Sequence, residues 1–376
     1  MPRIGIDYTS ALSQGGGIGR YTRELIAALA AFDAQTPYVL FAAGQRASTL
    51  PPAPGPNFGW TPSAITSEWF ARLWGRARLP LPVERWTGPL DLFHSPDFTL
   101  PPLRRGTRSL LTVHDLSFIR TPETAAPGLR AYLNRAVPYS VARADHVLAD
   151  SEATRQDLIA LYRTPPDKVS VLYSAVDSRF RPVTSPSALS AMRARYDIGD
   201  GPYILSVGTI QPRKNYPRLI EALRRLDRPD LRLVIAGGRG WLDSPLYDLV
   251  RSHKLEDRVK FLGFVADADL PALYSAASVF AFPSLYEGFG LPVLEAMACD
   301  VPVVTSRVSS LPEVAGEAAL LIDPLDVDDL AAALSRVLVD SAERHRLITA
   351  GRRQAQSFSW DVAARQLKGH YDRLLD

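Results

Sequence analysis

The chain has 376 residues, of which 46% are hydrophobic and 22% are charged, a composition that excludes a disordered or fibrous protein. Its 43 Lys and Arg residues and 40 Asp and Glu residues leave a net charge of +3, which is too balanced for a general nucleic-acid-binding protein. The single cysteine, Cys299, excludes a disulfide framework and a cysteine-rich zinc site, and it favours a reducing, cytoplasmic setting.

The first half of the chain alternates short apolar runs with segments of helical spacing. The apolar runs predict strands at 3–7, 38–42, 91–95, 109–114, 146–149 and 169–172. The helical spacing predicts helices at 18–32, 129–142 and 152–162. Residues 44–90, rich in Pro, Gly, Trp and Arg, show neither pattern. Short apolar strands separated by helices indicate a parallel sheet covered on both faces.

The second half repeats this rhythm. Strands are predicted at 203–207, 231–236, 259–261, 279–282, 301–305 and 319–322, with helices at 216–226, 270–276, 291–298 and 325–339. A Pro-containing stretch at 177–187, a polar helix at 187–196 and a Gly-rich turn at 199–202 separate the two halves. We therefore expect an α/β protein with two doubly wound, Rossmann-like domains at 1–180 and 181–356, followed by a helix at 357–376. Because parallel sheets bind ligands at the carboxyl ends of their strands, two such domains facing a cleft favour a two-substrate enzyme such as a transferase.

No targeting signal is expected. The chain opens on a strand rather than on a secretion leader, and no apolar run reaches the roughly 18–20 residues that a membrane helix needs. These features predict a cytoplasmic protein whose contact with a membrane would be peripheral, at the inner face of the cell membrane.

The strongest indication of chemistry is a carboxylate in a Gly-flanked turn, within residues 280–296. Glu287 lies between a buried strand and a helix N-terminus, where backbone amides can receive a phosphate. Glu295 lies about one helical turn further on, where it can accept hydrogen bonds from ribose hydroxyls. A carboxylate beside a phosphate is unfavourable unless the ligand also carries hydroxyl donors, so a polyhydroxylated ligand is expected. The alternative is a strand–turn–helix with two surface glutamates. The residues of the turn itself are Gly288, Phe289, Gly290 and Leu291.

A basic loop at 206–215 is the second indication. It follows a predicted strand, begins near Gly208 and ends in Arg213 and Lys214. Arginine can bind a diphosphate through two parallel hydrogen bonds, and lysine can bind it as a point charge. Lys214 is notable because only five of the 43 basic residues are lysine. The alternative is a basic loop that caps a helix.

A Gly-rich loop at 15–20 lies between the first strand and the first helix. It lacks the final glycine of the dinucleotide-binding pattern, where Arg20 stands instead, so a dinucleotide site is not expected. Gly16 and Gly17 are candidates for lining a phosphate or a sugar, and a flexible turn is the alternative.

Two histidines end predicted strands. His114, in the sequence VHDL, would face the cleft and could hydrogen-bond a sugar hydroxyl, and His94 is a weaker candidate for the same position. A structural role is the alternative for both. The six histidines show no metal-ligand spacing, so no metal site is expected.

A cationic and aromatic stretch marks the first half. Residues 1–180 carry 19 basic and 15 acidic residues, and arginines crowd residues 72–108. The aromatic side chains of residues 58–90 suggest a face for an acceptor or an anionic membrane surface, with local core packing and an ordinary solvated face as the alternatives. These aromatic residues are Trp60, Trp69, Phe70, Trp74 and Trp86.

Together these stretches resemble glycosyltransferase family 4, whose members are retaining enzymes of the GT-B architecture. The resemblance spans nearly the whole chain, and its most specific element is EGFGLPVLE at 287–295. It is also carried by VGTIQPRKN at 207–215, by the glycines at 15–20 and by VHDL at 113–116. The resemblance implies an acceptor-binding first domain, a donor domain that binds a nucleotide-diphosphate sugar, and a last helix that crosses back to the first domain.

The resemblance also implies roles for individual residues. Arg213 and Lys214 would hold the diphosphate, Glu295 the ribose, and Glu287 the transferred sugar, with His114 beside that sugar. The catalytic residues would then be Glu287, His114, Lys214 and Arg213. The donor would be bound by Gly16, Gly17, Gly208, Arg213, Lys214, Gly263, Val265, Glu287, Gly288, Phe289, Gly290, Leu291 and Glu295.

The form of the basic loop is most similar to bacterial mannosyltransferases that build surface polysaccharides. The resemblance therefore implies a retaining hexosyltransferase that uses no separate cofactor, with GDP-mannose favoured as the donor over UDP-sugars. The acceptor would be a saccharide or a lipid-linked saccharide, and the acceptor oxygen would attack from the side of the leaving group. A nucleotide-sugar epimerase of the same architecture is the alternative.

Overall fold

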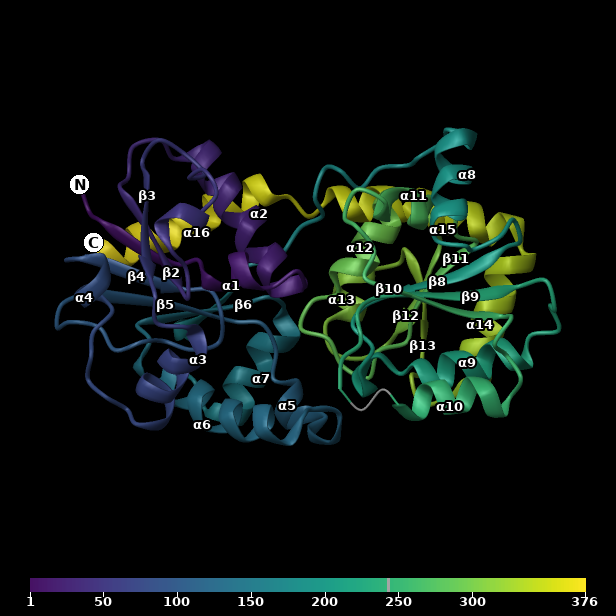
Figure 1. Cartoon of the computed structure of the whole chain (residues 1–376), viewed down its shortest axis with the longest axis horizontal. Coiled ribbons are helices and arrows are strands. Elements are labelled where there is room, and N and C mark those ends of the chain that lie inside the picture. The colour runs from purple at the N-terminus through teal and green to yellow at the C-terminus, as the bar shows by residue number, and fades with distance from the viewer. Residues whose placement is uncertain (242–243) are drawn as a thin grey trace. The chain divides into compact units, whose positions relative to one another are not determined.

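The computed structural model describes residues 1–241 and 244–376, which form two compact units (Figure 1). Unit 1 comprises Met1–Ile119, Pro127–Ser174 and Ser359–Asp376. Unit 2 comprises Arg120–Ala126 and Ala175–Phe358. Each unit contains one parallel β-sheet with helices, which confirms the predicted fold class.

The sheet of unit 1 has seven parallel strands in the order β3-β2-β1-β4-β5-β6-β7. The strands are β1 (Ile4–Asp7), β2 (Tyr38–Ala43), β3 (Phe58–Ser63), β4 (Leu92–Ser95), β5 (Arg108–Val113), β6 (His146–Ala149) and β7 (Val169–Val171). Strand order reverses between β1 and β4, which pair directly. The carboxyl ends of these two strands therefore form the topological switch point, where open α/β sheets bind their ligands.

The helices of unit 1 pack on a core shared with the last helix of the chain. The helices are α1 (Thr9–Ser13), α2 (Gly17–Phe32), α3 (Ser67–Phe70), α4 (Glu84–Thr87), α5 (Ser117–Arg120), α6 (Pro127–Arg143), α7 (Glu152–Tyr162) and α16 (Trp360–Leu375). A π-helix, η2 (Ala71–Arg76), continues α3. Helices α2 and α16 lie side by side in Figure 1 and bury one apolar cluster against the strands. The chain thus returns to its first unit through α16, because Leu367 and Tyr371 complete that core.

The sheet of unit 2 has six parallel strands in the order β10-β9-β8-β11-β12-β13. The strands are β8 (Tyr203–Val207), β9 (Arg232–Ala236), β10 (Val259–Gly263), β11 (Val279–Phe282), β12 (Val303–Ser306) and β13 (Ala319–Ile322). The helices are α8 (Pro186–Arg195), α9 (Tyr216–Arg225), α10 (Ser244–Ser252), α11 (Leu270–Ser275), α12 (Leu291–Ala298), α13 (Leu311–Ala315), α14 (Val327–Val339) and α15 (Ser341–Gln356). Here the switch point lies between the neighbouring strands β8 and β11.

Several elements were not predicted from the sequence, among them the short helices α1, α3, α4, α5 and α13, and also β3, α15 and α10. Strand β3 lies in the stretch for which we expected no element, because Gly59 and Pro62 weaken a strand pattern and are tolerated at a sheet edge. Helix α15 is mostly polar and buries few apolar side chains, among them Leu347 and Ala355, so its periodicity is weak. Helix α10 is short, and we assigned no element to its residues.

The limits of the two units differ from the predicted limits by a few residues. Residues 120–126 and 175–180 belong to unit 2, whereas we placed both segments in the first domain. For residues 175–180 the difference lies in their packing. The reason is that Phe180 is buried against Tyr274, with ring centroids 5.9 Å apart, in the core of unit 2. Unit 1 resumes at Ser359 rather than at residue 357, because Phe358 packs against Phe289 of unit 2.

Shortening Leu367 to Ala should destabilise unit 1 by about 2–5 kcal/mol, because Leu367 is fully buried and its loss leaves a cavity between α16 and the sheet. Urea unfolding followed by tryptophan fluorescence measures this, because five of the six tryptophans lie in unit 1: Trp60, Trp69, Trp74, Trp86 and Trp360.

The matched control is Val362→Ala in the same helix, where the side chain is 53% exposed. Its effect should stay within about 0.5 kcal/mol. Equal effects of the two substitutions would contradict the packing of α16 in this core.

Candidate functional site

The turn that carries Glu287 connects β11 to α12. Strand β11 is fully buried, and α12 begins at Leu291 as predicted. Gly290 precedes the helix with φ +114°, a conformation that favours glycine. A Cβ atom at this position would lie 2.9 Å from Leu311 Cδ2, so a larger residue would also require the Leu311 side chain to shift.

Three predicted site residues meet at the switch point of the unit 2 sheet. Arg213 and Lys214 lie in the loop after β8, and Glu287 lies in the loop after the adjacent strand β11. Arg213 Nη1 lies 2.6 Å from Glu287 Oε2, and Lys214 Nζ lies 2.7 Å from Glu287 Oε1. Lys214 is 8% exposed and Glu287 is 7% exposed. We call these three residues the charge triad.

The electrostatics of the triad keep Glu287 ionised. Burial raises the pKa of this carboxyl, but the charges and hydrogen bonds of Arg213 and Lys214 outweigh burial and lower it to about 2. The triad thus holds two cations and one anion at neutral pH, a net charge of +1. Lys214 Nζ also lies 4.4 Å from the ring centroid of Phe282, whose face attracts a cation. Together these contacts form a buried cationic site whose groups are held before any ligand arrives.

Gly208, at the end of β8, makes room for the lysine. Its φ is +155°, and a Cβ atom there would lie 2.9 Å from Lys214 Cε. The lysine side chain therefore runs across this glycine to reach Glu287. The sequence pointed to Gly208 as part of a basic loop, and the structure gives it this steric role.

Polar residues to which the sequence analysis assigned no role hold the two loops. Asn215 Nδ2 donates to Pro283 O at 2.9 Å, which ties the basic loop to the Glu287 turn. Ser310 Oγ donates to Glu287 O at 3.0 Å, and Ser309 Oγ accepts from the Glu287 amide at 2.9 Å. The position of Asn215 directly after Lys214 could have indicated its role in the site. The two serines follow a different strand, β12, and no local sequence pattern indicates theirs.

Glu295 lies on α12 and is 2% exposed. Its Oε2 accepts a hydrogen bond from the Tyr274 hydroxyl at 2.8 Å. Gly263 ends β10, and after it Phe264 is 74% exposed whereas Val265 is buried. The four residues of the predicted phosphate-binding turn precede or begin α12, and they are Gly288, Phe289, Gly290 and Leu291.

His114 follows β5 in unit 1 and is buried at 6% exposure. Its Nδ1 lies 2.7 Å from Asp150 Oδ2, and its Nε2 lies 2.8 Å from Pro96 O. Two acceptors require a hydrogen on each ring nitrogen, so the ring is an imidazolium. Burial lowers the pKa of His114, but Asp150 and the carbonyl outweigh burial and raise it to about 9. A hydrogen bond from this ring to a sugar would therefore have to replace one of these two contacts.

Acidic residues that the sequence analysis did not single out surround His114. Asp7 ends β1, Asp97 follows β4 and Asp150 follows β6, so all three lie at the carboxyl edge of the sheet. Burial raises the pKa of Asp7 to about 6, despite hydrogen bonds from Thr9 that lower it. Asp150 Oδ1 is buried and has no hydrogen-bond partner. This edge is thus rich in carboxylate oxygens near the start of the Gly-rich loop.

The other candidates of unit 1 have different surroundings. Gly16 and Gly17 are exposed at the N-terminus of α2. His94 is fully buried, with its ring nitrogens 2.8 Å from the Tyr371 hydroxyl and 3.0 Å from Thr112 Oγ1. Burial lowers the pKa of His94 to about 3, so this ring is neutral and holds α16 to the sheet. The contacts of His94 therefore fit a structural role, which was the alternative to its binding a sugar.

The aromatic stretch divides into buried and exposed members. Phe70, Trp74 and Trp86 pack against one another, with centroids 4.1–5.9 Å apart. Trp60 packs edge-on against Tyr8 at 5.3 Å. Local packing thus accounts for these four aromatic residues. Trp69 is 54% exposed, with the Arg72 guanidinium 4.7 Å from its ring centroid.

The described residues contain neither a membrane-spanning helix nor a metal-binding cluster. Over residues 1–241 and 244–376, no helix is long and apolar enough to cross a membrane. The same residues contain no group of three or more His, Cys, Asp or Glu side chains arranged to hold a metal ion.

Comparison with known families and proteins gives consistent matches. Residues 15–180 match Glycosyltransferase Family 4, and residues 190–354 match Glycosyl transferases group 1. The chain is 38% identical over 286 residues to O-antigen chain mannosyltransferase B of Escherichia coli, which covers 75% of this chain and 74% of that protein. It is 35% identical over 317 residues to D-inositol 3-phosphate glycosyltransferase of Salinispora tropica, covering 76% of this chain and 64% of that protein. It is 32% identical to the serotype-specific mannosyltransferase WbdA of Escherichia coli, of which it covers 36%.

Solved structures show the same fold at low sequence identity. Sucrose-phosphate synthase from Thermosynechococcus elongatus has a TM-score of 0.76 at 24% identity, covering 100% of this chain and 99% of that chain. HepE of Anabaena, in complex with UDP and glucose, has a TM-score of 0.76 at 20% identity, covering 99% and 100%. These likenesses and the two parallel sheets identify the fold as GT-B. By its sequence matches and its fold, the chain belongs to the family 4 and group 1 glycosyltransferases.

Proposed function

We propose that the protein transfers a hexose, with mannose favoured, from a nucleotide-diphosphate sugar to a growing saccharide of a surface polysaccharide, with retention at the anomeric carbon. The observation that carries the proposal is the charge triad, in which the buried Lys214 and the partly buried Arg213 flank Glu287 at the switch point of the unit 2 sheet. A cationic pair beside a helix N-terminus suits a diphosphate, and a carboxylate suits sugar hydroxyls.

The relatives support the choice of sugar and product. Two of them are named as mannosyltransferases, one acting on the O-antigen chain, and both come from Escherichia coli. The neighbour HepE was solved with UDP-glucose, which supports a nucleotide-sugar donor in this fold. GDP-mannose is our favoured donor because the mannosyltransferase is the more similar of these proteins, at 38% identity.

In the proposed reaction, the bond between the sugar and the diphosphate breaks, and the diphosphate gains negative charge. Arg213 and Lys214 would stabilise that charge together with the amides at the start of α12, because fixed donors in a buried site need little reorganisation. The acceptor oxygen would attack from the same face, and a phosphate oxygen would take its proton. Glu287 would then orient the transferred sugar while it bridges the two cations.

The remaining candidates would bind the rest of the donor. Glu295 would accept the ribose hydroxyls, which requires it to release or share the Tyr274 hydroxyl. Gly263 and Val265 would offer backbone atoms to the base, next to the exposed ring of Phe264. In unit 1, His114 would lie beside the sugar, and Gly16 and Gly17 would line the phosphate or the sugar.

Replacing Glu287 with Gln should lower turnover by about 100-fold or more, because the variant loses the charge that orients the sugar. Binding of nucleoside diphosphate should not weaken, since both cations remain and lose their anionic partner. Turnover is followed as release of nucleoside diphosphate, and affinity by calorimetry.

A control for the Glu287 variant is Glu343→Gln in α15, another buried glutamate with arginine partners. It should leave turnover unchanged. Near-normal turnover of the Glu287 variant would refute the proposed role of the triad.

Nucleoside diphosphates should stabilise unit 2 against heat, with GDP more effective than UDP if the donor is GDP-mannose. A ligand at 100 times its Kd raises the free energy of unfolding by about 2.7 kcal/mol, which gives a measurable rise in Tm. Lys214→Gln should remove most of this rise because Nζ is a central cation of the site. The exposed residue Lys254, replaced with Gln, is the control that should retain it. No rise with any nucleoside diphosphate would rule out a nucleotide-sugar donor.

The charge of His114 predicts a pH dependence in unit 1. Because the pair with Asp150 raises the pKa from 6.5 to about 9, its contribution to stability is complete below pH 6.5 and is lost as pH rises through 9. Asp150→Asn should lower this pKa, measured from the pH dependence of the His114 ring resonances by NMR. The control is Asp115→Asn, which should change the pKa of His114 little. The Asp115 carboxylate accepts a hydrogen bond from the Ser117 amide rather than from His114. An unchanged pKa in the Asp150 variant would contradict the ion pair.

A further inference from the structure

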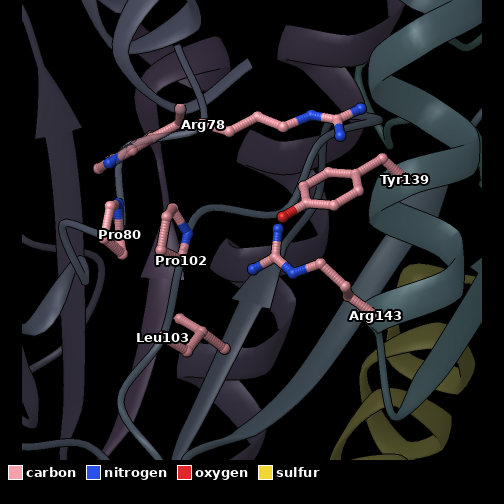
Figure 2. A pocket seen from close by; sticks show the side chains of 7 residues that line it. Arg78, Pro80, Pro102, Leu103, Tyr139 and Arg143 are labelled. Atoms are coloured by element: carbon pink, nitrogen blue, oxygen red, sulfur yellow. The ribbon is translucent and has the colours of Figure 1, made fainter. Parts of the chain in front are cut away.

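A second cationic site lies in unit 1, away from the charge triad. It is a pocket of about 180 Å³ between α6 and the segments around residues 74–80 and 102–103 (Figure 2). Its lining combines two arginines with aromatic and apolar side chains: Trp74, Arg78, Pro80, Pro102, Leu103, Tyr139 and Arg143.

Two guanidinium groups converge on one aromatic ring in this pocket. Arg78 Cζ lies 4.6 Å from the ring centroid of Tyr139, and Arg143 Cζ lies 4.8 Å from it. Figure 2 shows the arginines approaching the ring from different segments of the chain. Arg78 has a left-handed backbone, with φ +49°, which is unfavourable for a residue other than glycine. The fold thus accepts local strain at the residue that brings a second guanidinium group to the Tyr139 ring.

Within the part of the chain that the structure describes, these two arginines have no acidic partner. Arg143 donates to the carbonyls of Leu100 at 3.2 Å and Pro101 at 2.7 Å, which fixes it without neutralising its charge. Over residues 1–241 and 244–376, neither Arg78 nor Arg143 forms an ion pair. Two like charges at one pocket repel each other, and a bound anion would relieve that repulsion.

One acidic residue of this stretch, Glu84, is buried and bound within the fold. Glu84 is 2% exposed and accepts from the Arg104 amide at 3.0 Å and the Thr107 hydroxyl at 2.7 Å. Asp91 accepts from the Arg3 amide at 2.7 Å. Five further arginines of the stretch are exposed and have no ion pair among the described residues, and they are Arg72, Arg76, Arg85, Arg104 and Arg105. The surface around the pocket therefore keeps its positive charge.

The surroundings of the pocket are also partly apolar. Leu103, Pro80, Pro102 and Trp74 form part of its lining. Next to it in the chain, Leu79 is 39% exposed and Trp69 is 54% exposed. A ligand with an anionic group joined to an apolar chain would satisfy both kinds of surface.

We propose that this pocket binds a phosphate group through the guanidinium groups of Arg78 and Arg143, which flank the Tyr139 ring. Guanidinium groups suit phosphate because they offer parallel hydrogen bonds as well as charge. Two sources of the group share this chemistry, namely the headgroup of an anionic lipid and a free phosphate. The proposal does not depend on the donor site of unit 2, because every residue of the pocket belongs to unit 1.

The test uses the whole chain, with its unit 2 site saturated with GDP, and the variant Arg78→Asn. Asparagine tolerates a left-handed backbone, and Arg78 is exposed, so this variant should keep its melting temperature. One arm measures cosedimentation with vesicles of phosphatidylcholine, with and without phosphatidylglycerol. The other arm measures binding of inorganic phosphate by calorimetry. The matched control is Arg85→Gln, which removes one exposed positive charge of the same stretch outside the pocket.

The expected result is a loss of affinity of about tenfold or more for Arg78→Asn and less than about twofold for Arg85→Gln. Loss confined to the phosphatidylglycerol vesicles identifies a lipid headgroup as the source. Loss in the inorganic phosphate arm identifies a site for the free anion. Equal losses of affinity for the two variants would show an effect of general surface charge and would overturn the proposal. Affinity that is unchanged in the Arg78→Asn variant in both arms, or no binding by the unsubstituted chain in either arm, would also overturn it.

Discussion

The buried contact of Glu287 with Arg213 and Lys214 is the constraint on which the candidate site depends. Each of these charges would be unfavourable alone in a buried position, and together they leave a single positive charge beside the start of α12. The contact also fixes two loops, because Asn215 and Ser310 hold the same backbone from either side. The residues of the charge triad are therefore candidates for binding a ligand, and they also lie in the two loops that these hydrogen bonds fix.

Both units follow one topological rule. In each sheet, strand order reverses between two neighbouring strands, and polar residues gather at the carboxyl ends of those strands. Unit 2 places Arg213 and Lys214 there, whereas unit 1 places Asp7 and Asp97 there, with the His114 imidazolium after the next strand, β5. Phosphate oxygens suit the first set, and hydroxyl donors suit the second.

The surface charge of residues 68–108 in unit 1 depends on which acidic side chains form ion pairs with the arginines, as well as on how many acidic residues there are. The stretch at 68–108 contains acidic residues, but Glu84 and Asp91 satisfy backbone amides and are not available to neighbouring arginines. Among the described residues, the exposed arginines Arg72, Arg76, Arg85, Arg104 and Arg105 therefore remain without an ion pair. The same stretch shows that tryptophan content alone does not identify a binding face, since Trp74 and Trp86 are mainly packed against Phe70.

The sequence by itself determined the alternation of strands and helices, the start of α12 at Leu291 and the residue types of the site, because these depend on neighbours in the chain. It did not reveal β3 or α15, whose side chains have weak periodicity. Only the tertiary structure decided that Lys214 reaches Glu287, 73 residues away, and that both ring nitrogens of His114 are already occupied. The physical reason is that strand order decides which loops become adjacent, and strand order is set by the packing of the whole sheet rather than by any local pattern.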